Sequence, residues 1–202
     1  MIDKYKEVAK DTARSALRAF YIFKWMSQAI HQDKNGMKKA KENWAIRQKY
    51  PDFFDQVYIS TFDSFVINLW KFFDKRSDSQ LRLNNLMSKY KSELRNALVG
   101  RIETKIKSLE ESHKGTKELV ETFRHDLVVH RKLDFLATRF AYKKIEKLFA
   151  GVCEIIDLLN NSRYDWDYER DINKDMDLLF QDLGTVENQK STTSKLRGRT
   201  RQ

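Results

Sequence analysis

The side chains with the clearest chemical potential lie in one short segment, residues 123–131, which has the sequence FRHDLVVHR. In it, Arg124 is followed by two of the chain's four histidines, His125 and His130. Histidine exchanges protons near neutral pH, and a guanidinium stabilises negative charge on phosphoryl oxygens. The segment therefore contains the groups needed to move a proton and to stabilise an anion at phosphorus.

The spacing of these groups restricts how they can meet. Arg124 and His130 are six residues apart, which places them about 120° apart around a straight α-helix. On such a helix they cannot both face one phosphate. Either a helix begins between them, or a second copy of the chain supplies the missing group. A two-fold dimer with two such segments face to face would pair Arg124 of one chain with His130 of the other.

A purely structural role for the same residues is the alternative. His130 would then be a buried core histidine whose hydrogen bonds are satisfied. Arg124 would be a surface ion-pair partner of Glu121 or Asp126. Spacing alone does not decide between this interpretation and the chemical one, because an arginine followed by a histidine recurs easily by chance.

The composition predicts an all-α fold. Thirteen phenylalanines, eight tyrosines and four tryptophans supply enough large apolar surface for a buried core. Only six glycines and one proline are present, which leaves few residues for hairpin turns. We therefore expect an antiparallel helical bundle with few loops.

Apolar residues recur at three- and four-residue steps along most of the chain, and this periodicity predicts helices. A basic stretch at residues 37–49 is predicted to be a short helix or an ordered loop, anchored by Trp44. Residues 1–183 are predicted to form a single domain that begins with a long helix. Residues 184–202 lack apolar periodicity and are predicted to form a flexible, disordered basic tail. The predicted helices span residues 3–31, 51–74, 81–90, 92–112, 116 to the motif, 132–161 and 171–182.

Charge indicates the kind of partner. The formal net charge is +10 and the isoelectric point is about 9.5, so the surface attracts polyanions, of which nucleic acid is the commonest. The chain starts with charged residues rather than an apolar signal, and no uncharged run approaches the ~18 residues that span a bilayer. We expect a cytoplasmic protein with no membrane partner.

Other chemistries have little support in the sequence. Cys153, the only cysteine, lies in an apolar run and is predicted to be a buried structural thiol. There is no HExxH motif, no glycine-rich phosphate loop and no cysteine cluster. Asp165, Asp167 and Asp171 have a spacing that does not demand a cation. We expect neither a metal ion nor a cofactor.

At Arg124, His125 and His130 the chain resembles the HEPN superfamily of helical ribonucleases, in its abortive-infection, AbiU-type branch. That family carries an arginine, then Asn, Asp or His, and then a histidine a few residues later. His125 fills the restricted position directly after the arginine.

Two further stretches are similar to the same branch. Residues 69–79, followed by Leu83 and Leu86, resemble its helix end and turn. Residues 128–131, with Asp134 after them, resemble the surroundings of its histidine. The resemblance spans roughly residues 55–160.

The resemblance implies a metal-independent endoribonuclease that acts as a toxin or anti-phage effector. The 2′-hydroxyl of the RNA would attack the adjacent phosphorus and leave a 2′,3′-cyclic phosphate. His130 would be the general acid or base, and Arg124 would stabilise the charge on the phosphoryl oxygens. His125 and Arg131 would bind or orient the phosphate. Asp134, one helical turn after His130, would fix the tautomer of that histidine.

The resemblance also implies a homodimer whose active site forms where the segments around residues 120–140 meet. A regulatory protein or antitoxin is a further expected partner. In HEPN toxins silenced by a nucleotidyltransferase, a tyrosine follows the histidine by two positions. Here that position is Lys132, so the resemblance does not extend to this mode of control.

Two other functions fit the same sequence. One is a HEPN-like bundle that binds RNA or a nucleotide without cleaving it. The other is an interaction protein whose basic residues at 37–49 and in the tail dock an acidic partner. Cleavage by the wild type beside a His130→Ala variant separates these functions from an enzyme.

Overall fold

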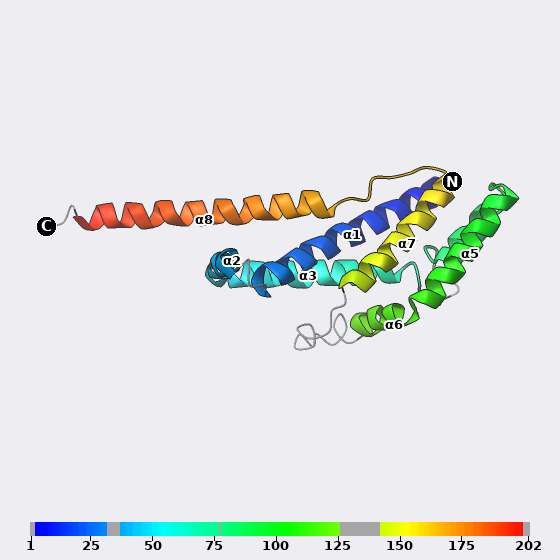
Figure 1. Cartoon of the computed structure of the whole chain (residues 1–202), viewed down its shortest axis with the longest axis horizontal. Coiled ribbons are helices and arrows are strands. Elements are labelled where there is room, and N and C mark those ends of the chain that lie inside the picture. Colours follow the sequence, from blue (N-terminus) through cyan, green and yellow to red (C-terminus); the bar gives the residue numbers. More distant parts are fainter. Residues whose placement is uncertain (1–2, 32–36, 77, 126–141, 200–202) are drawn as a thin grey trace. The chain divides into compact units, whose positions relative to one another are not determined.

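The computed structural model describes the backbone of residues 3–31, 37–76, 78–125 and 142–199, and the side chains of residues 4–27, 42–76, 78–125 and 142–184. Over these residues the chain is an all-α helical bundle without strands, as predicted. The helices are α1 (Asp3–His31), α2 (Met37–Lys49), α3 (Pro51–Trp70), α4 (Leu83–Tyr90), α5 (Asn96–Ser112), α6 (Lys114–Phe123), α7 (Tyr142–Asn160) and α8 (Glu169–Arg199) (Figure 1).

Several helix boundaries match the predictions to within two residues, but α5 starts at Asn96 instead of residue 92, and α3 ends earlier than predicted. The predicted helix start at residue 132 lies outside the described residues. Helix α3 stops at Trp70 instead of continuing to about residue 74. The N–H groups of Phe72 and Phe73 donate to the carbonyls of Leu69 and Trp70, three residues back in each case. Such bonds tighten the last turn and satisfy carbonyls that a helix end leaves open. The tight turn therefore replaces the last predicted helical turn.

Helix α8 is longer than the helix predicted at residues 171–182. Its backbone continues helically through residues 184–199, where the sequence predicted a tail without regular structure. No proline interrupts this stretch, and each residue added to an existing helix gains one backbone hydrogen bond. The extension therefore does not require an apolar stripe.

The chain divides into two compact units that share α1 and α3. Unit 1 comprises Met1–Phe20 and Thr61–Trp166, and it contains α4 to α7. Unit 2 comprises Tyr21–Ser60 and Asp167–Gln202, and it contains α2 and α8. None of the described helices is long and apolar enough to cross a membrane.

In unit 1, α7 packs against α4, α5 and α6, and it lies between α1 and α5 in Figure 1. Its apolar stripe is fully buried, as the predicted periodicity requires. At the contact between α5 and α7, a Cβ atom on Gly151 would overlap Cδ1 of Leu109, so an added methyl group would require the end of that side chain to move. Cys153 is buried in the same stripe, and burial raises the pKa of its thiol, so the predicted structural role is confirmed.

A chain of ring contacts ties the end of α6 to the start of α7. Phe123 meets Phe62 at 5.5 Å between ring centroids, and Phe62 meets Phe65 at 5.1 Å. Phe65 meets Phe20 at 5.6 Å, and Phe20 meets Tyr142 at 6.3 Å. The two helix ends that flank residues 126–141 are therefore both fixed to one aromatic core.

Unit 2 has its own core, formed around Phe54 and Phe180, whose rings are 5.0 Å apart. Trp44, the predicted anchor of α2, is 44 % exposed and does not fill that role. Instead Asn43 is buried and Ile46 packs against the core of unit 2. Residues 43 and 46 lie three apart and share a helix face that excludes residue 44.

Candidate functional site

The structure describes two of the five residues that the sequence singled out. Arg124 follows α6 with helical backbone angles, φ −60° and ψ −44°. It is half-buried, and His125 after it is exposed. His130, Arg131 and Asp134 lie outside the described residues, so their roles stay predictions.

The guanidinium of Arg124 lies over an aromatic ring. Its Cζ atom is 5.8 Å from the centre of the Trp70 ring, at the end of α3. Among the described residues, Arg124 has neither an ion pair nor a hydrogen bond through its side chain. Of the two ion pairs that the structural alternative allowed, the one with Glu121 is not formed, and Glu121 pairs with Lys75 instead. The other candidate, Asp126, lies outside the described residues. The five N–H donors of this guanidinium are therefore uncommitted within the described part of the chain.

The end of α3 and its turn contact α6 along one stripe. Lys117 lies 5.5 Å from the Phe73 ring centre, and the Nζ atom of Lys75 lies 3.8 Å from a carboxylate oxygen of Glu121. The third contact along this stripe is the one between Arg124 of α6 and Trp70 of α3. Residues 117, 121 and 124 are four and three apart, which is the spacing of one helix face.

A buried carboxylate lies in the same turn. Asp74 is 5 % exposed, and its oxygens accept hydrogen bonds from the backbone N–H of Arg76 at 3.2 Å, from Nε at 2.9 Å and from Nη2 at 2.6 Å. The Arg76 side chain, above all through its hydrogen bonds, holds the pKa of Asp74 below its usual range. The charge of Arg124 adds to this lowering without a direct bond.

The turn itself is fixed to α4. The backbone N–H of Leu83 donates to the Phe72 carbonyl at 3.1 Å, and the Asn85 side chain donates to the Ser79 carbonyl at 2.8 Å. Residues 71–82 are therefore held at both ends by hydrogen bonds. Because the turn is fixed in this way, it can hold the α6 side chains that it contacts in a fixed position.

Sequence reasoning selected residues 69–79 as similar to a known branch but assigned no role to Trp70 or Asp74. The available signal was weak: a tryptophan four residues before an aspartate at a helix end. Only the fold shows that Trp70 contacts Arg124, which lies 54 positions later along the chain, and that Asp74 feels the charge of Arg124.

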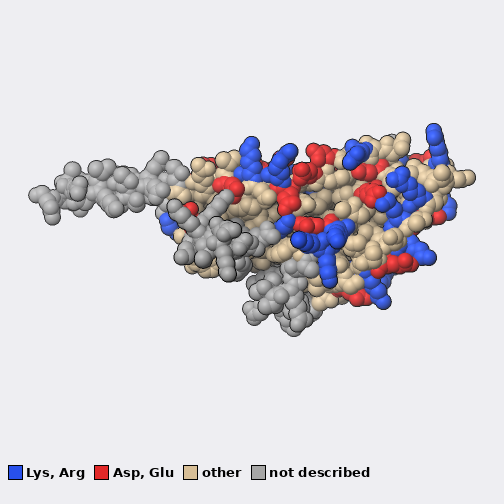
Figure 2. All heavy atoms as spheres, in the orientation of Figure 1, with Lys and Arg blue, Asp and Glu red and all other residues tan. Residues whose placement is uncertain are grey.

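A group of lysines marks the start of α7. Lys143, Lys144 and Lys147 are exposed, and none of them has an ion pair among the described residues. Figure 2 shows Lys and Arg side chains gathered over this end of the helix. In the sequence, the lysines follow directly after the segment that carries His130.

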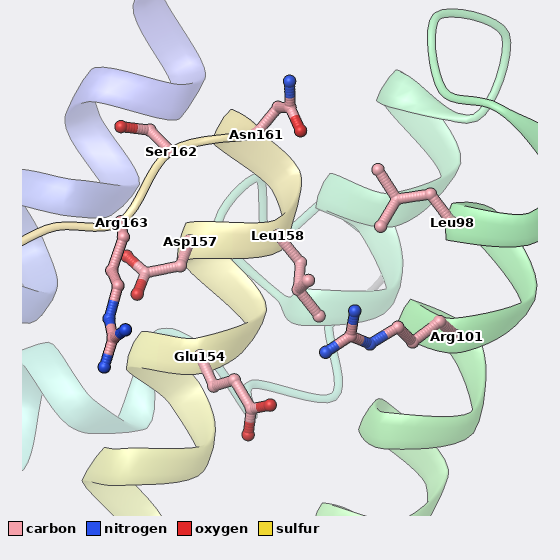
Figure 3. A pocket seen from close by; sticks show the side chains of 8 residues that line it. All are labelled: Leu98, Arg101, Glu154, Asp157, Leu158, Asn161, Ser162 and Arg163. Carbon is pink, nitrogen blue, oxygen red and sulfur yellow. The ribbon is translucent and has the colours of Figure 1, made fainter.

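A second candidate is a hollow of about 550 Å³ at the other end of α7. Arg101 from α5 and Arg163 after α7 line it without an ion-pair partner among the described residues. Glu154 and Asp157 line it too, so the hollow presents both signs of charge (Figure 3). Asp157 accepts a hydrogen bond from Trp166 Nε1 at 3.0 Å, which fixes the segment after α7 to that helix. The α7 residues that line the hollow begin at Glu154, 12 positions after Tyr142, so the hollow starts about 18 Å along the helix from that end.

In the part of the chain that the structure describes, no three His, Cys, Asp or Glu side chains gather as they would around a metal ion.

These features define a helical-bundle protein in which an arginine at the end of a helix lies on a buried tryptophan and has no ion pair among the described residues. The HEPN_AbiU2 family model, described as AbiU2, matches residues 2–174. This match covers most of the chain, so the protein belongs to the AbiU2 family of HEPN-like abortive-infection proteins, and the predicted resemblance is confirmed. No curated protein and no solved structure matches the chain.

Proposed function

We propose that this protein is a HEPN-type endoribonuclease that acts as an abortive-infection effector, with its active site at a homodimer interface. The observation that carries the proposal is the state of Arg124. A half-buried guanidinium with no partner among the described residues is ready to bind an anion. Membership of the AbiU2 family supports RNA as the substrate that supplies this anion.

In the proposed reaction, the 2′-oxygen of one ribose attacks the adjacent phosphorus. The bond from phosphorus to the 5′-oxygen of the next nucleotide breaks, and a 2′,3′-cyclic phosphate remains. One proton leaves the 2′-hydroxyl and one proton joins the departing 5′-oxygen. His130 transfers one of these protons, since its ordinary pKa lies near neutrality.

Arg124 stabilises the negative charge that grows on the phosphoryl oxygens during this step. A planar guanidinium offers two parallel N–H donors, which match two oxygens of one phosphate. The platform of Trp70 leaves these donors unoccupied by protein groups among the described residues. Because the donors are already aligned, little reorganisation is needed when the charge develops.

A dimer resolves the geometry of the motif. Arg124 keeps helical backbone angles at the end of α6, so His130 would be turned away from it if the helix continued. In a two-fold dimer, the Arg124 of one protomer and the His130 of its partner act on one phosphate.

The test compares the wild type with His130→Ala and Arg124→Ala, expressed in cells and as purified proteins. The wild type is expected to arrest growth and to leave RNA ends with a 2′,3′-cyclic phosphate. His130→Ala should lower cleavage by on the order of 10²- to 10⁴-fold, which is the usual contribution of a general acid or base. Matched controls are Arg101→Ala and His113→Ala, the same replacements at residues remote from the motif.

A result in which His130→Ala cleaves RNA as fast as the wild type would contradict the ribonuclease proposal. If the wild type binds RNA with a steep salt dependence and cleaves none, the protein is an RNA-binding module instead. If it binds no RNA and purifies with an acidic protein, its basic surface serves that partner.

A further inference from the structure

We propose that Trp70 and Asp74 are positioning residues that hold the Arg124 guanidinium ready for a phosphate. This inference rests on the proposed ribonuclease function for its purpose, but not for its geometry. Neither residue needs to touch the substrate. They act through the turn at the end of α3, which contacts α6 from residue 117 to residue 124.

Trp70 provides the surface on which Arg124 rests. Its side chain is buried, at 5 % exposure, and its Nε1 atom has no hydrogen-bond acceptor among the described residues. A phenylalanine would avoid this unpaired donor, whereas an indole offers the most attractive ring face to a cation. The indole is therefore suited to hold the cation by its face, at 5.8 Å from Arg124 Cζ.

Asp74 attracts Arg124 without binding it. A buried carboxylate would normally form a direct ion pair with the nearest guanidinium, which would block that guanidinium for substrate. Here Arg76, which is 71 % exposed, already supplies two side-chain donors and one backbone donor to Asp74. Asp74 therefore fixes the turn that follows Trp70, and the donors of Arg124 stay free because the charges of Asp74 and Arg124 act on each other only through space.

Arg76 therefore has a defined part in the arrangement. Arg76 donates hydrogen bonds to the Asp74 carboxylate, so Arg124 is not needed as a donor to that group. Removing the Arg76 side chain would leave a buried carboxylate without its main partner, and Arg124 is the other cation acting on that carboxylate. Arg76→Gln should then draw Arg124 onto Asp74 and weaken the binding of phosphate.

The experiment follows the Arg124 Nε–H signal by ¹H–¹⁵N NMR of the full-length protein, with the signal assigned by its loss in Arg124→Lys. Three variants change the platform or the carboxylate: Trp70→Leu, Trp70→Phe and Asp74→Asn. Asp78→Asn is the matched control, because it removes the same charge from an exposed residue of the same turn. Cleavage of a short RNA gives kcat and KM for each variant.

A ring under the guanidinium shifts the Arg124 signal by its ring current. We expect Trp70→Leu to abolish this shift and Trp70→Phe to retain part of it, a difference that mere filling of space would not produce. Asp74→Asn should move and broaden the signal. Both Trp70→Leu and Asp74→Asn should lower kcat by roughly ten- to hundredfold, as expected for a misplaced catalytic group, with KM little changed. Asp78→Asn should match the wild type.

The outcomes separate this inference from the proposed function. If the Arg124 signal and kcat are unchanged in Asp74→Asn and Trp70→Phe while His130→Ala is inactive, the positioning role is wrong and the ribonuclease remains. If the signal moves as expected but the wild type cleaves no RNA, Trp70 and Asp74 do position Arg124 and the ribonuclease proposal fails. The Phe and Asn replacements introduce no added bulk, so the test survives a failure of Trp70→Leu to fold.

Discussion

Arg124 lies with its guanidinium 5.8 Å from the centre of the Trp70 ring, while Glu121, one turn earlier on α6, pairs with Lys75 instead. This division leaves the cation at the end of the helix without a carboxylate partner among the described residues. A surface arginine usually gains a partner or full solvation. Arg124 instead is half-buried and lies on an aromatic face, and the variants below test the proposal that it binds an anion.

Arg124→Lys should therefore lower RNA cleavage although it preserves the charge. Lysine carries a compact ammonium that cannot make the bidentate contact of a guanidinium, and it stacks less well on an indole. We expect a loss of on the order of 10²- to 10³-fold in kcat, as for other groups that stabilise a developing anion. Initial rates with a fluorescent RNA measure it. Arg101→Lys, at an arginine that also lacks an ion pair among the described residues, is the control and should retain full activity.

The stability of the fold should depend on the charge of Asp74. Its folded-state pKa is lowered, chiefly by hydrogen bonds from Arg76, so its ionised form contributes stability that is fully present above the unfolded pKa of about 3.9. That contribution is lost as the pH falls through the lower, folded pKa. Asp74→Asn should consequently be less stable than the wild type at pH 7, and the difference should shrink toward pH 2. Urea unfolding at a series of pH values measures this.

An exposed aspartate provides the comparison. Asp175→Asn, on α8, removes the same charge from a residue without a described partner. It should change the free energy of unfolding little at any pH. A constant gap between Asp74→Asn and the wild type from pH 7 to pH 2 would show that packing, and not charge, makes Asp74 important.

Lys143, Lys144 and Lys147 should contribute to RNA binding without taking part in chemistry. Each phosphate contact with single-stranded nucleic acid adds about 0.7 to the slope of log K against log salt. Replacing all three lysines with glutamine should therefore reduce that slope by up to about 2 and weaken binding most at low salt. Fluorescence anisotropy with 2′-O-methylated RNA, which cannot be cleaved, measures binding alone.

The control removes an equal charge elsewhere. Lys4, Arg95 and Lys114 are exposed and have no described partner, so their triple replacement with glutamine leaves the net charge identical to that of the α7 variant. If both triple variants reduce the slope equally, RNA responds to net charge only, and the start of α7 is not a binding surface.

Much of this fold could be predicted from the sequence because buried helices repeat apolar residues at three- and four-residue steps. The apolar stripes of α4 and α7 could be recognised from the sequence, and the structure buries their described residues as expected. On α1 the expected stripe is buried from Ala16 to Met26, but Val8 nearer the start of the helix is 40 % exposed. The early end of α3 could not be recognised, since it depends on backbone hydrogen bonds within residues 69–73 that side chains do not encode. The extension of α8 has the same origin, because helix propagation needs no periodic pattern.

The sequence predicted only part of the candidate site. Arg124 was found because a restricted residue, His125, follows it. The partnership of Trp70 with Arg124 joins residues from separate helices, and local spacing carries no information about such a contact. Likewise, Glu121 was an equally good partner for Arg124 by spacing, and only the position of Lys75 shows that the pair does not form.

The close contact between α5 and α7 gives a stability prediction. Gly151→Ala would place a methyl group against Leu109, which is buried, and overpacking of this kind typically costs about 1–3 kcal/mol. Gly100→Ala is the matched control on α5, where an added Cβ meets no atom within 4 Å and helix propensity gains up to about 1 kcal/mol. Thermal unfolding should place Gly151→Ala at least about 1 kcal/mol below Gly100→Ala. Equal stability of the two variants would mean that Leu109 moves aside at no cost.

A shared active site makes a prediction that no single variant can test. If Arg124 of one chain and His130 of its partner serve one site, then Arg124→Ala and His130→Ala chains are inactive alone but form one intact site in a mixed dimer. Co-expression with two different tags should restore on the order of a quarter of wild-type activity, because half of the dimers are mixed and each has one working site.

A second mixture, of wild-type chains with a double variant, distinguishes the shared site from a site within one chain. Wild-type chains co-expressed with the double variant Arg124→Ala/His130→Ala have no intact site in the mixed dimer when the groups come from different chains. They keep one intact site when both groups come from the same chain. Activity should therefore fall to about a quarter of the wild-type value under the shared arrangement and to about half under the other. If the first mixture regains activity and the second falls to about a quarter of the wild-type value, Arg124 and His130 of one site come from different protomers. The reverse pattern would assign both groups to a single chain.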